Sequence, residues 1–278
     1  MDKTEHLLRL QGRELWSQQA MLQDRTKRAE IAAMKPRKIL GIGDIHEPYH
    51  DTKAIEWACD KGGDCDTVVL MGDTANLDSV SRFTKTSNVP IDYEYNVLVD
   101  LFDFFSKNFR RVVVLRANHE NRLPNLIRSL LPPPVVEVMQ RMGHIDLISF
   151  LALQYKNVYA VNEWCRLGDI YFSHKEVFST IAMRSVSIVD DYFQLHYEDV
   201  RPAVVAHAHT HHFGFIPHKE RMLIETGTMC HYMDYALSGR PGPSAKEVWH
   251  QGCFTAELDR KQRVKDCQPH YRGICGRA

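Results

Sequence analysis

The stretch KILGIGDIH, residues 38–46, decides how the rest of the chain is interpreted. Its first five residues form a short, mostly aliphatic run, which is typical of a buried strand. The run ends at Gly43, and two potential metal ligands, Asp44 and His46, follow at once. In an α/β sheet the loops after the strands converge at one edge, where ligands bind. We therefore expect Asp44 and His46 to lie in a binding site.

The same arrangement recurs along the chain. The apolar runs that we interpret as strands are Lys38–Ile42, Thr67–Met71, Arg111–Leu115, Asn157–Val161, Ile170–Ser173 and Ala203–Ala206. Five of them lead into Asp, Asn or His, and these residues are Asp44, His46, Asp73, Asn118, His119, His174, His207, His209 and His211. Helical patterns lie between several runs, at Thr52–Lys61 and Tyr93–Asn108. This alternation predicts a single α/β domain.

Residue types at these spacings favour a site for two metal ions. The D-x-H spacing lets Asp44 and His46 chelate one ion from a loop, and the H-x-H spacing lets His209 and His211 do the same. A carboxylate can bridge two ions that lie a few Å apart. Imidazole, carboxylate and amide ligands suit zinc, manganese or iron better than calcium.

The ordered set resembles the calcineurin-like metallophosphoesterases over about residues 38–258. Their pattern is D-x-H, G-D, G-N-H-D/E, an isolated His and G-H-x-H, and this chain has Asp44/His46, Gly72-Asp73, Asn118-His119-Glu120, His174 and His209-Thr210-His211. The stretch Gly43–Asp51 looks most like phage and bacterial members. The resemblance implies a four-layer α/β/β/α sandwich of two mixed sheets.

The resemblance also implies a role for each residue of the set. The first ion would be held by Asp44, His46 and His211. Asp73 would bridge the ions, and the second would be held by Asn118, His174 and His209. His119 would face the substrate and protonate the leaving group. Arg122 is a candidate for contact with a phosphate oxygen, with a salt bridge to a neighbouring acid as the alternative.

Such a site implies hydrolysis of phosphate mono- or diesters. Two divalent ions (Mn, Zn or Fe) would lower the pKa of a bridging water, so that hydroxide attacks the phosphorus near neutral pH. The alternatives are a metal-dependent nuclease or nucleic-acid-binding protein that uses basic terminal segments, and a catalytically silent scaffold that binds metal. The expected partner is a phosphate ester, with nucleic acid as a further candidate.

Several positions depart from the family pattern. Ala117 and Ala208 replace glycines, which is tolerable where φ is negative. Asn76 stands where the family commonly has Asp, and either Asn76 or Asp78 is a candidate to support a ligand. We interpret His207 as a strand residue packed beneath the site; a shifted register with His207 and His209 as ligands is the alternative.

The formal charge is zero, with 35 basic and 35 acidic side chains. This balance argues against a protein that coats nucleic acid with a uniformly basic surface. The neutral total hides basic ends: residues 1–38 carry nine basic and five acidic side chains, and residues 260–278 carry six and one. These ends are either solvated surface or contacts for phosphate-rich partners. Fifteen histidines are a high load, in keeping with metal binding.

The apolar spacing predicts a helix over residues 4–34, which Pro36 ends. We divide the chain into a basic helical extension, residues 1–36, and a phosphoesterase domain with a basic tail, residues 37–278. The extension is a candidate for dimer formation through Leu15, Trp16 and Leu22. The insert Leu123–Phe150 is a candidate to cap the site.

Cysteine usage and hydropathy bear on the compartment. The seven cysteines are scattered, odd in number and without a C-x-x-C pair, which indicates reduced thiols. No apolar run reaches the length of a membrane span, and residues 1–38 contain no apolar segment of signal-peptide length. We expect a cytoplasmic protein without membrane contact.

Overall fold

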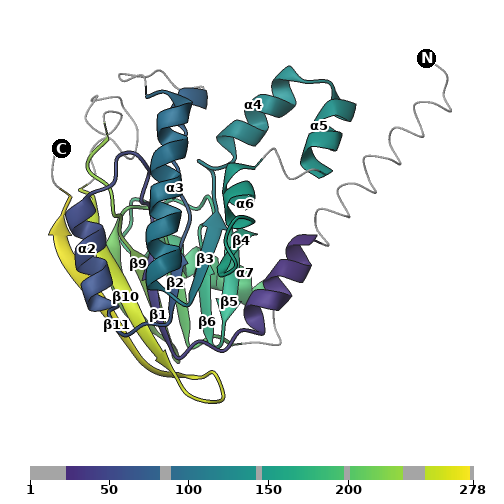
Figure 1. Ribbon diagram of the computed structural model, residues 1–278. Helices are drawn as coiled ribbons and strands as arrows, with labels where there is room; N and C mark the ends of the chain where they lie inside the picture. The colour runs from purple at the N-terminus through teal and green to yellow at the C-terminus, as the bar shows by residue number, and fades with distance from the viewer. Residues whose placement is uncertain (1–22, 82–88, 142–145, 197–200, 234–247, 276–278) are drawn as a thin grey trace.

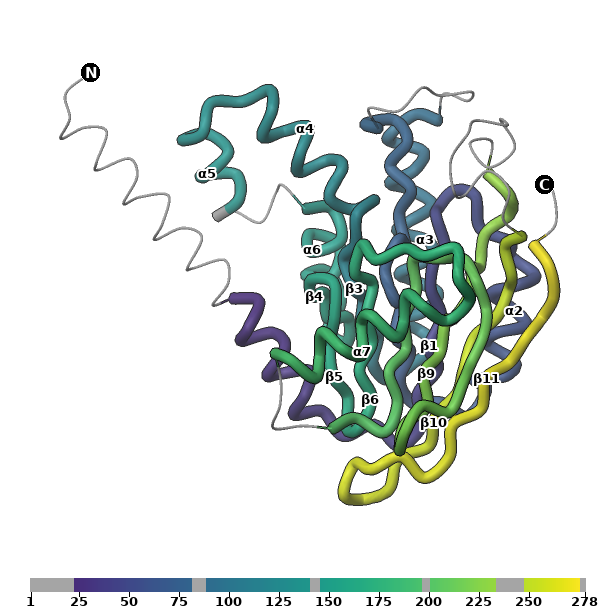
Figure 2. The backbone as a smooth tube through the Cα atoms, turned by 180° about the vertical axis from the view of Figure 1, so that it is seen from behind, coloured from purple at the N-terminus to yellow at the C-terminus, as the bar shows by residue number. Residues whose placement is uncertain are grey.

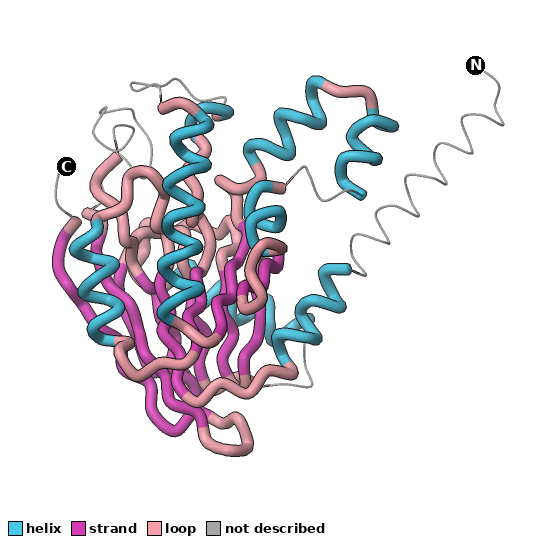
Figure 3. Tube along the Cα trace, in the orientation of Figure 1, coloured by secondary structure: helices cyan, strands magenta, loops and turns pink. Residues whose placement is uncertain are grey.

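The computed structural model describes residues 23–81, 89–141, 146–196, 201–233 and 248–275. Two β-sheets pack face to face, and helices cover their outer faces (Figures 1 and 3). This arrangement confirms the expected α/β sandwich of two mixed sheets.

The first sheet has six strands in the order β11-β10-β1-β2-β3-β4. Strands β1 to β4 run parallel, whereas β10 is antiparallel to both β1 and β11. The bounds of these strands are β1 Lys38–Ile42, β2 Thr67–Leu70, β3 Arg111–Arg116, β4 Val158–Asn162, β10 His250–Leu258 and β11 Val264–Ile274. The parallel strands bring the loops that follow β1, β2 and β3 to one edge of the sheet.

The second sheet has five strands in the order β5-β6-β7-β9-β8, and it is also mixed. Parallel pairing joins β6 to β7 and β7 to β9, and antiparallel pairing joins the two outer pairs. The strand bounds are β5 Trp164–Leu167, β6 Ile170–Ser173, β7 Val204–His207, β8 Phe213–His218 and β9 Arg221–Thr226.

Alternation of side chains along the strands builds three apolar layers. In β1, Ile39 points into the core between the sheets, whereas Leu40 packs on the outer face beneath the helices. The outer layer of the first sheet includes residues of α2, α3 and α6, and that of the second sheet includes Val186, Val189 and Phe193 of α7. Because β-strand side chains alternate between faces, both faces of each sheet are buried.

The helices begin and end where local chemistry allows. Helix α2 begins after Asp51, whose carboxylate accepts a hydrogen bond from the Ala54 backbone N–H at 3.2 Å, and it ends at Gly62. Helix α6 uses Asp146 in the same way. The helix bounds are α2 Thr52–Lys61, η1 Asp78–Val80, α3 Ile91–Asn108, α4 Arg122–Leu130, α5 Pro133–Arg141, α6 Leu147–Ala152 and α7 Arg184–His196.

Residues 23–32 are helical and lie against the β4 side of the molecule, as seen from both sides in Figures 1 and 2. Ile31 is buried between the sheets, and Arg28 donates hydrogen bonds to the backbone carbonyls of Asn162 (2.9 Å) and Trp164 (3.1 Å). The predicted helix over residues 4–34 therefore agrees with the structure from residue 23 to 32. Its earlier part, including Leu15, Trp16 and Leu22, lies outside the described residues.

The basic tail contains the edge strand β11, which the sequence did not indicate. Three of the cations of the tail have acidic partners: Lys265 with Glu257, Arg263 with Asp259 and Arg272 with Asp51, at 2.8, 3.0 and 3.3 Å. These contacts favour the interpretation of the tail as solvated surface. All seven cysteines are free, and among the described residues no helix is long and apolar enough to cross a membrane.

Candidate metal centre

The candidate residues come from loops at the carboxyl ends of five strands. Asp44 and His46 follow β1, Asp73 follows β2, and Asn118 and His119 follow β3. From the second sheet, His174 follows β6, and His209 and His211 follow β7. The two sheets therefore contribute to one site, which the alternation of strand and helix signals could not show.

Five of these residues have a left-handed backbone. The residues with positive φ are Asp44 (54°), His46 (53°), Asp73 (46°), His209 (87°) and His211 (57°). Each left-handed conformation costs a non-glycine residue on the order of 1–3 kcal/mol, and residues in such conformations cluster at functional sites. The strand β7 ends at His207, so His209 and His211 lie beyond the strand and do not continue its alternation of faces. The left-handed turns direct the last two toward the site instead.

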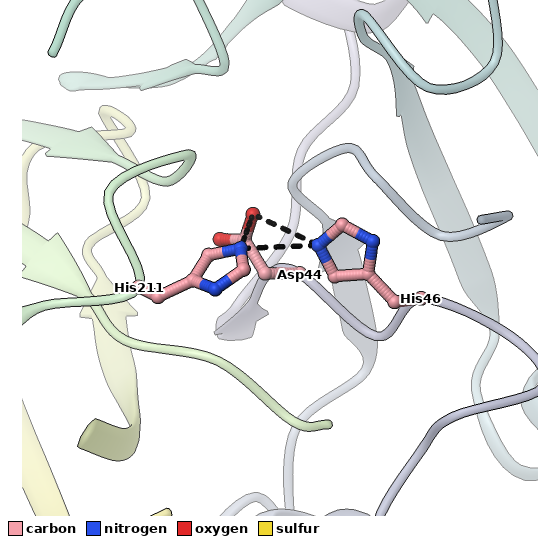
Figure 4. Close-up of side chains that lie close together, drawn as sticks. All are labelled: Asp44, His46 and His211. Atoms are coloured by element: carbon pink, nitrogen blue, oxygen red, sulfur yellow. Dashed lines mark hydrogen bonds and ion pairs between the residues drawn. The ribbon is translucent and has the colours of Figure 1, made fainter. Parts of the chain in front are cut away.

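Asp44, His46 and His211 form one buried group whose side chains point toward a common centre (Figure 4). The Nε2 atoms of His46 and His211 are 3.1 Å apart. The Oδ1 atom of Asp44 lies 3.3 Å from Nε2 of His211 and 3.8 Å from Nε2 of His46. One carboxylate and two imidazoles at this spacing suit a borderline divalent ion.

Asp73 belongs to two further groups, one with His174 and His209 and one with His46 and His119. Its Oδ2 atom lies 3.2 Å from Nε2 of His174 and 3.9 Å from Nε2 of both His46 and His119. A carboxylate between two such groups has the position that a bridging ligand needs.

Buried polar atoms at this site are left without hydrogen bonds among the described residues. They are Asp44 Oδ1, Asn118 Oδ1, His174 Nε2, His209 Nδ1 and His211 Nδ1. An unsatisfied buried polar atom is costly, and native structures rarely keep several together without a ligand. Three of these atoms, Asp44 Oδ1, Asn118 Oδ1 and His174 Nε2, belong to oxygen and nitrogen donors suited to divalent ions. The site thus fits the two ions that the family implies.

The electrostatics favour cations at the same place. Burial alone would raise the pKa of Asp44, but His211 and His174 outweigh it and hold the pKa at about 2. Burial alone would lower the pKa of His174, but Asp73 and Asp44 raise it to about 10. The two carboxylates therefore stay ionised and create a negative potential in which positive charge is stable.

The candidate ligands are oriented by neighbours that are not ligands. Asn76 Oδ1 lies 3.1 Å from Nδ1 of His46, and the Met71 carbonyl accepts a hydrogen bond from Nδ1 of His174 at 2.7 Å. Both contacts leave the Nε2 atoms facing the carboxylates. The Thr228 hydroxyl donates to the Asp44 carbonyl at 2.6 Å and holds that strained residue in place.

Glu120 ties two loops together. Its Oε1 atom accepts from the backbone N–H of Thr74 at 2.6 Å and of Ala75 at 3.1 Å, and its Oε2 atom accepts from Ala117 N–H at 2.8 Å. Burial and the neighbouring Asp73 raise its pKa to about 7. These contacts order the two loops on either side of Asp73 and His119.

Arg122 is held beside His119. It donates to the Asn76 carbonyl at 2.7 Å and pairs with Asp78 at 3.0 Å, so the salt-bridge alternative describes its position here. Its Nη2 atom lies 3.1 Å from Nε2 of His119. Burial and then the charge of Arg122, offset in part by Asp73, lower the pKa of His119 to about 4.

Small residues allow the loops to approach closely. A Cβ on Gly72, whose φ is +91°, would lie 2.6 Å from Nδ1 of His174 and 2.8 Å from Cβ of Ala117. Neither Ala117 nor Ala208 has positive φ, so the alanines that replace the family glycines are unstrained, as expected. A Cβ on Gly43 would lie 2.7 Å from Cβ of Ala208, so the extra methyl is accommodated by Gly43.

The structure places His207 outside all three groups. It is buried at the end of β7, with Nε2 3.4 Å from the Val177 carbonyl, and burial lowers its pKa to about 3. The buried ring of Trp249 packs edge-on against His211 at a centroid distance of 4.1 Å. No spacing signal in the sequence points to that contact.

The fold and the site define a class of protein. It is an α/β sandwich in which buried aspartates and histidines lie together at one edge of the sheets, in an arrangement suited to metal binding. The calcineurin-like phosphoesterase family matches residues 37–221, more than half of the chain. The chain belongs to that family. It is a metallophosphoesterase with a buried His/Asp cluster consistent with a dinuclear metal site.

Solved structures offer distant likenesses. An archaeal phosphodiesterase is 14% identical, with 84% of this chain and 99% of that chain covered and a TM-score of 0.43. Zinc-complexed Vps29 from Entamoeba histolytica is 13% identical, covers 84% and 98%, and has a TM-score of 0.41. A hypothetical protein from Pyrococcus horikoshii is 9% identical, covers 85% and 88%, and has a TM-score of 0.48. The comparison with curated proteins found no match.

Proposed function

We propose that this protein hydrolyses phosphate mono- or diesters with two divalent ions. The observation that carries the proposal is the position of Asp73 between the group of His46 and the group of His174 and His209. A site that holds two ions at a shared carboxylate is suited to clamp a phosphoryl group.

In this proposal each side chain has one task. Asp44, His46 and His211 would hold the first ion, Asn118, His174 and His209 would hold the second, and Asp73 would be shared between them. When bound, the ions supply Lewis acidity that activates water and offsets phosphoryl charge. Manganese, zinc and iron suit the donor set.

His119 and Arg122 act on the substrate. The Nδ1 atom of His119 donates to the Asn76 carbonyl at 3.2 Å, which directs Nε2 toward Asp73 and the space above it. We propose that Arg122 leaves His119 to bind a phosphate oxygen, that Nε2 of His119 then takes up a proton from water, and that this proton passes to the departing oxygen of the ester.

A direct assay tests the proposal. Purified protein is loaded with manganese and offered bis(p-nitrophenyl) phosphate and p-nitrophenyl phosphate, before and after EDTA. We expect turnover of at least one ester that EDTA abolishes and manganese restores. Absence of metal-dependent turnover of both esters, in a sample whose metal content is measured, would contradict it.

A nuclease or nucleic-acid-processing role is the second candidate. The observation that favours it is the helix of residues 23–32, which has three cations and two acidic residues and lies on the β4 side of the molecule. Gel-shift comparison of the full chain with a version lacking residues 1–22 tests the part of the extension outside the docked helix. Equal binding by both would assign any nucleic-acid contact to the remaining chain.

Two finer assignments remain proposals. The division at residue 36 is supported by the family match, which begins at residue 37. Membership in the phage and bacterial branch is supported by the stretch Gly43–Asp51 alone.

A further inference from the structure

A cavity lies along the same edge of the first sheet as the metal centre. It has a volume of about 330 Å³ and is lined by residues 23–27 of the N-terminal helix, by α4, α5 and α6, and by the last residues of β3 and β4, Arg116 and Asn162. Figures 1 and 2 both show these helices gathered on the β4 side. We call it the β4-side pocket.

Positively charged side chains outnumber negatively charged ones in the lining of the β4-side pocket. Its lining has three cations, Lys27, Arg116 and Arg128, and two anions, Asp24 and Asp146. Asp146 pairs with Arg116 and also caps α6. Asp24 pairs with Arg28 at 2.8 Å and accepts from the Asn162 backbone N–H at 3.1 Å.

Both anions are therefore already neutralised, and two cations are left over. Among the described residues Lys27 and Arg128 form no ion pair; Arg128 donates only to the neutral Asn125, at 3.3 Å. The Nε atom of Arg116 is buried without a hydrogen-bond partner within the described part of the chain. Partial burial of its side chain and then the charge of Arg116 lower the pKa of Lys27, although Asp24 and Glu30 act in the opposite direction.

The loop after β3 connects the pocket to the metal centre. Arg116 and Asn121 line the pocket, while the intervening His119 belongs to one of the three groups of the metal centre. Neighbouring strands lie about 4.8 Å apart, so a pocket at the ends of β3 and β4 lies roughly 5–10 Å from a site at the ends of β1 to β3.

We propose that the β4-side pocket binds a second phosphate of an oligonucleotide whose scissile phosphate lies at the metal centre. The distance between the β4-side pocket and the metal centre exceeds the distance between the two phosphorus atoms of a diphosphate, which share one oxygen. A nucleic-acid strand carries phosphates at intervals of a few Å along its length and can span both places. This inference rests on the proposed phosphoesterase function and names its substrate class.

Two exposed cations allow a test without disturbing the fold. The double variant Lys27→Gln/Arg128→Gln removes the unpaired charges, whereas Arg116 is kept because its pair with Asp146 is partly buried. The matched control is Arg25→Gln/Arg110→Gln, which removes two exposed cations that do not line the pocket. Both variants change the net charge equally.

Binding is measured on the manganese-loaded protein by fluorescence anisotropy with a fluorescein-labelled phosphorothioate (dT)8, from 50 to 200 mM salt. We expect the double variant to bind at least about tenfold more weakly, since each lost contact is a hydrogen bond to a charged group. The slope of log K against log salt should become shallower by about one, because one phosphate contact is lost. The control should match the wild type.

Kinetics separate this inference from the proposed function. The double variant should raise KM for (dT)8 and leave kcat/KM for bis(p-nitrophenyl) phosphate, which has one phosphate, unchanged. A wild type inactive on every ester would contradict the proposed function. The binding measurements would still show whether the β4-side pocket contacts the oligonucleotide. Equal binding by the double variant and the control, no binding by the wild type, or an effect limited to inorganic pyrophosphate would each overturn the inference.

Discussion

Asn76 Oδ1 lies 3.1 Å from Nδ1 of His46 and joins two loops that are 30 residues apart in the chain. If His46 binds an ion through Nε2, its proton is on Nδ1, and this N–H donates a hydrogen bond to Asn76 Oδ1. The hydrogen bond thereby fixes both the tautomer and the ring orientation of a candidate ligand.

Asn76→Ala should weaken metal binding. Loss of such a supporting hydrogen bond typically costs roughly 10–100-fold in metal affinity or activity. Asn76→Asp keeps an acceptor and should retain most of the affinity, so it is the matched variant. Titration with manganese, followed by activity, measures both. Equal affinity in the alanine and aspartate variants would show that Asn76 does not support the ligand.

Asp73→Asn tests the bridging position. An amide keeps the size of the side chain but removes the charge that two ions share, so we expect metal content to fall from two ions per chain to one or fewer. Activity should fall by at least roughly a hundredfold, because several kcal/mol of charge stabilisation are lost. Metal analysis of the purified protein is the measurement. The exposed Asp60→Asn is the control and should keep both ions.

His119→Asn distinguishes two roles for His119, proton donor and metal ligand. The geometry permits the second role too, because His119 lies in one group with His46 and Asp73. A proton donor matters most when the leaving group is a poor one. We expect activity on an alkyl phosphate ester to fall by roughly 10²–10⁴-fold and on a p-nitrophenyl ester by much less. Metal content should stay unchanged; loss of an ion would instead make His119 a ligand.

Gly72→Ala should destabilise the protein by about 1–3 kcal/mol, the usual cost of a strained backbone region. The new methyl would also meet His174 Nδ1 at 2.6 Å, so metal binding should weaken as well. Gly63→Ala is the control, since its Cβ would meet only ordinary contacts at 3.4 and 3.9 Å. Thermal unfolding with and without manganese measures both effects. Comparable losses in the two variants would contradict the argument.

Asp51→Ala tests whether strand β11 is part of the folded unit. Asp51 caps α2, accepts from Gln251 Nε2 at 3.0 Å and pairs with Arg272 at 3.3 Å. The cap alone contributes about 1 kcal/mol at neutral pH. Glu56→Ala, an exposed change on the same helix, should have little effect.

The pH dependence of that loss has a definite sign. Burial would raise the pKa of Asp51, but the hydrogen bonds from Gln251 and Ala54 and the charge of Arg272 outweigh it, so the pKa lies below 3.8. The ionised carboxylate therefore stabilises the fold above pH 3.8 and loses this contribution as pH falls through and below that value. The difference in unfolding free energy between the wild type and Asp51→Ala should shrink there, as denaturant titration at several pH values would show.

Much of the first sheet and of the metal residues could be predicted from the sequence. The run Lys38–Ile42 and the helix Thr52–Lys61 have the bounds that the structure shows, since aliphatic runs and an Asp cap are local signals. Strands β5, β8 and β11 were missed. The edge strand β11 alternates polar residues and depends on pairing with β10, which no local pattern reveals.

The sequence by itself determined which residues are candidates to carry the chemistry and in what order they occur, because residue type and spacing are properties of the chain. Only the tertiary structure decided that Asp73 stands between two groups, that left-handed turns aim His209 and His211, and that Trp249 packs on His211. It alone placed Lys27 beside Arg128, some hundred positions away, in the β4-side pocket. The physical reason is that these relationships depend on how two sheets and a helix pack, and packing joins residues whose separation along the chain carries no signal.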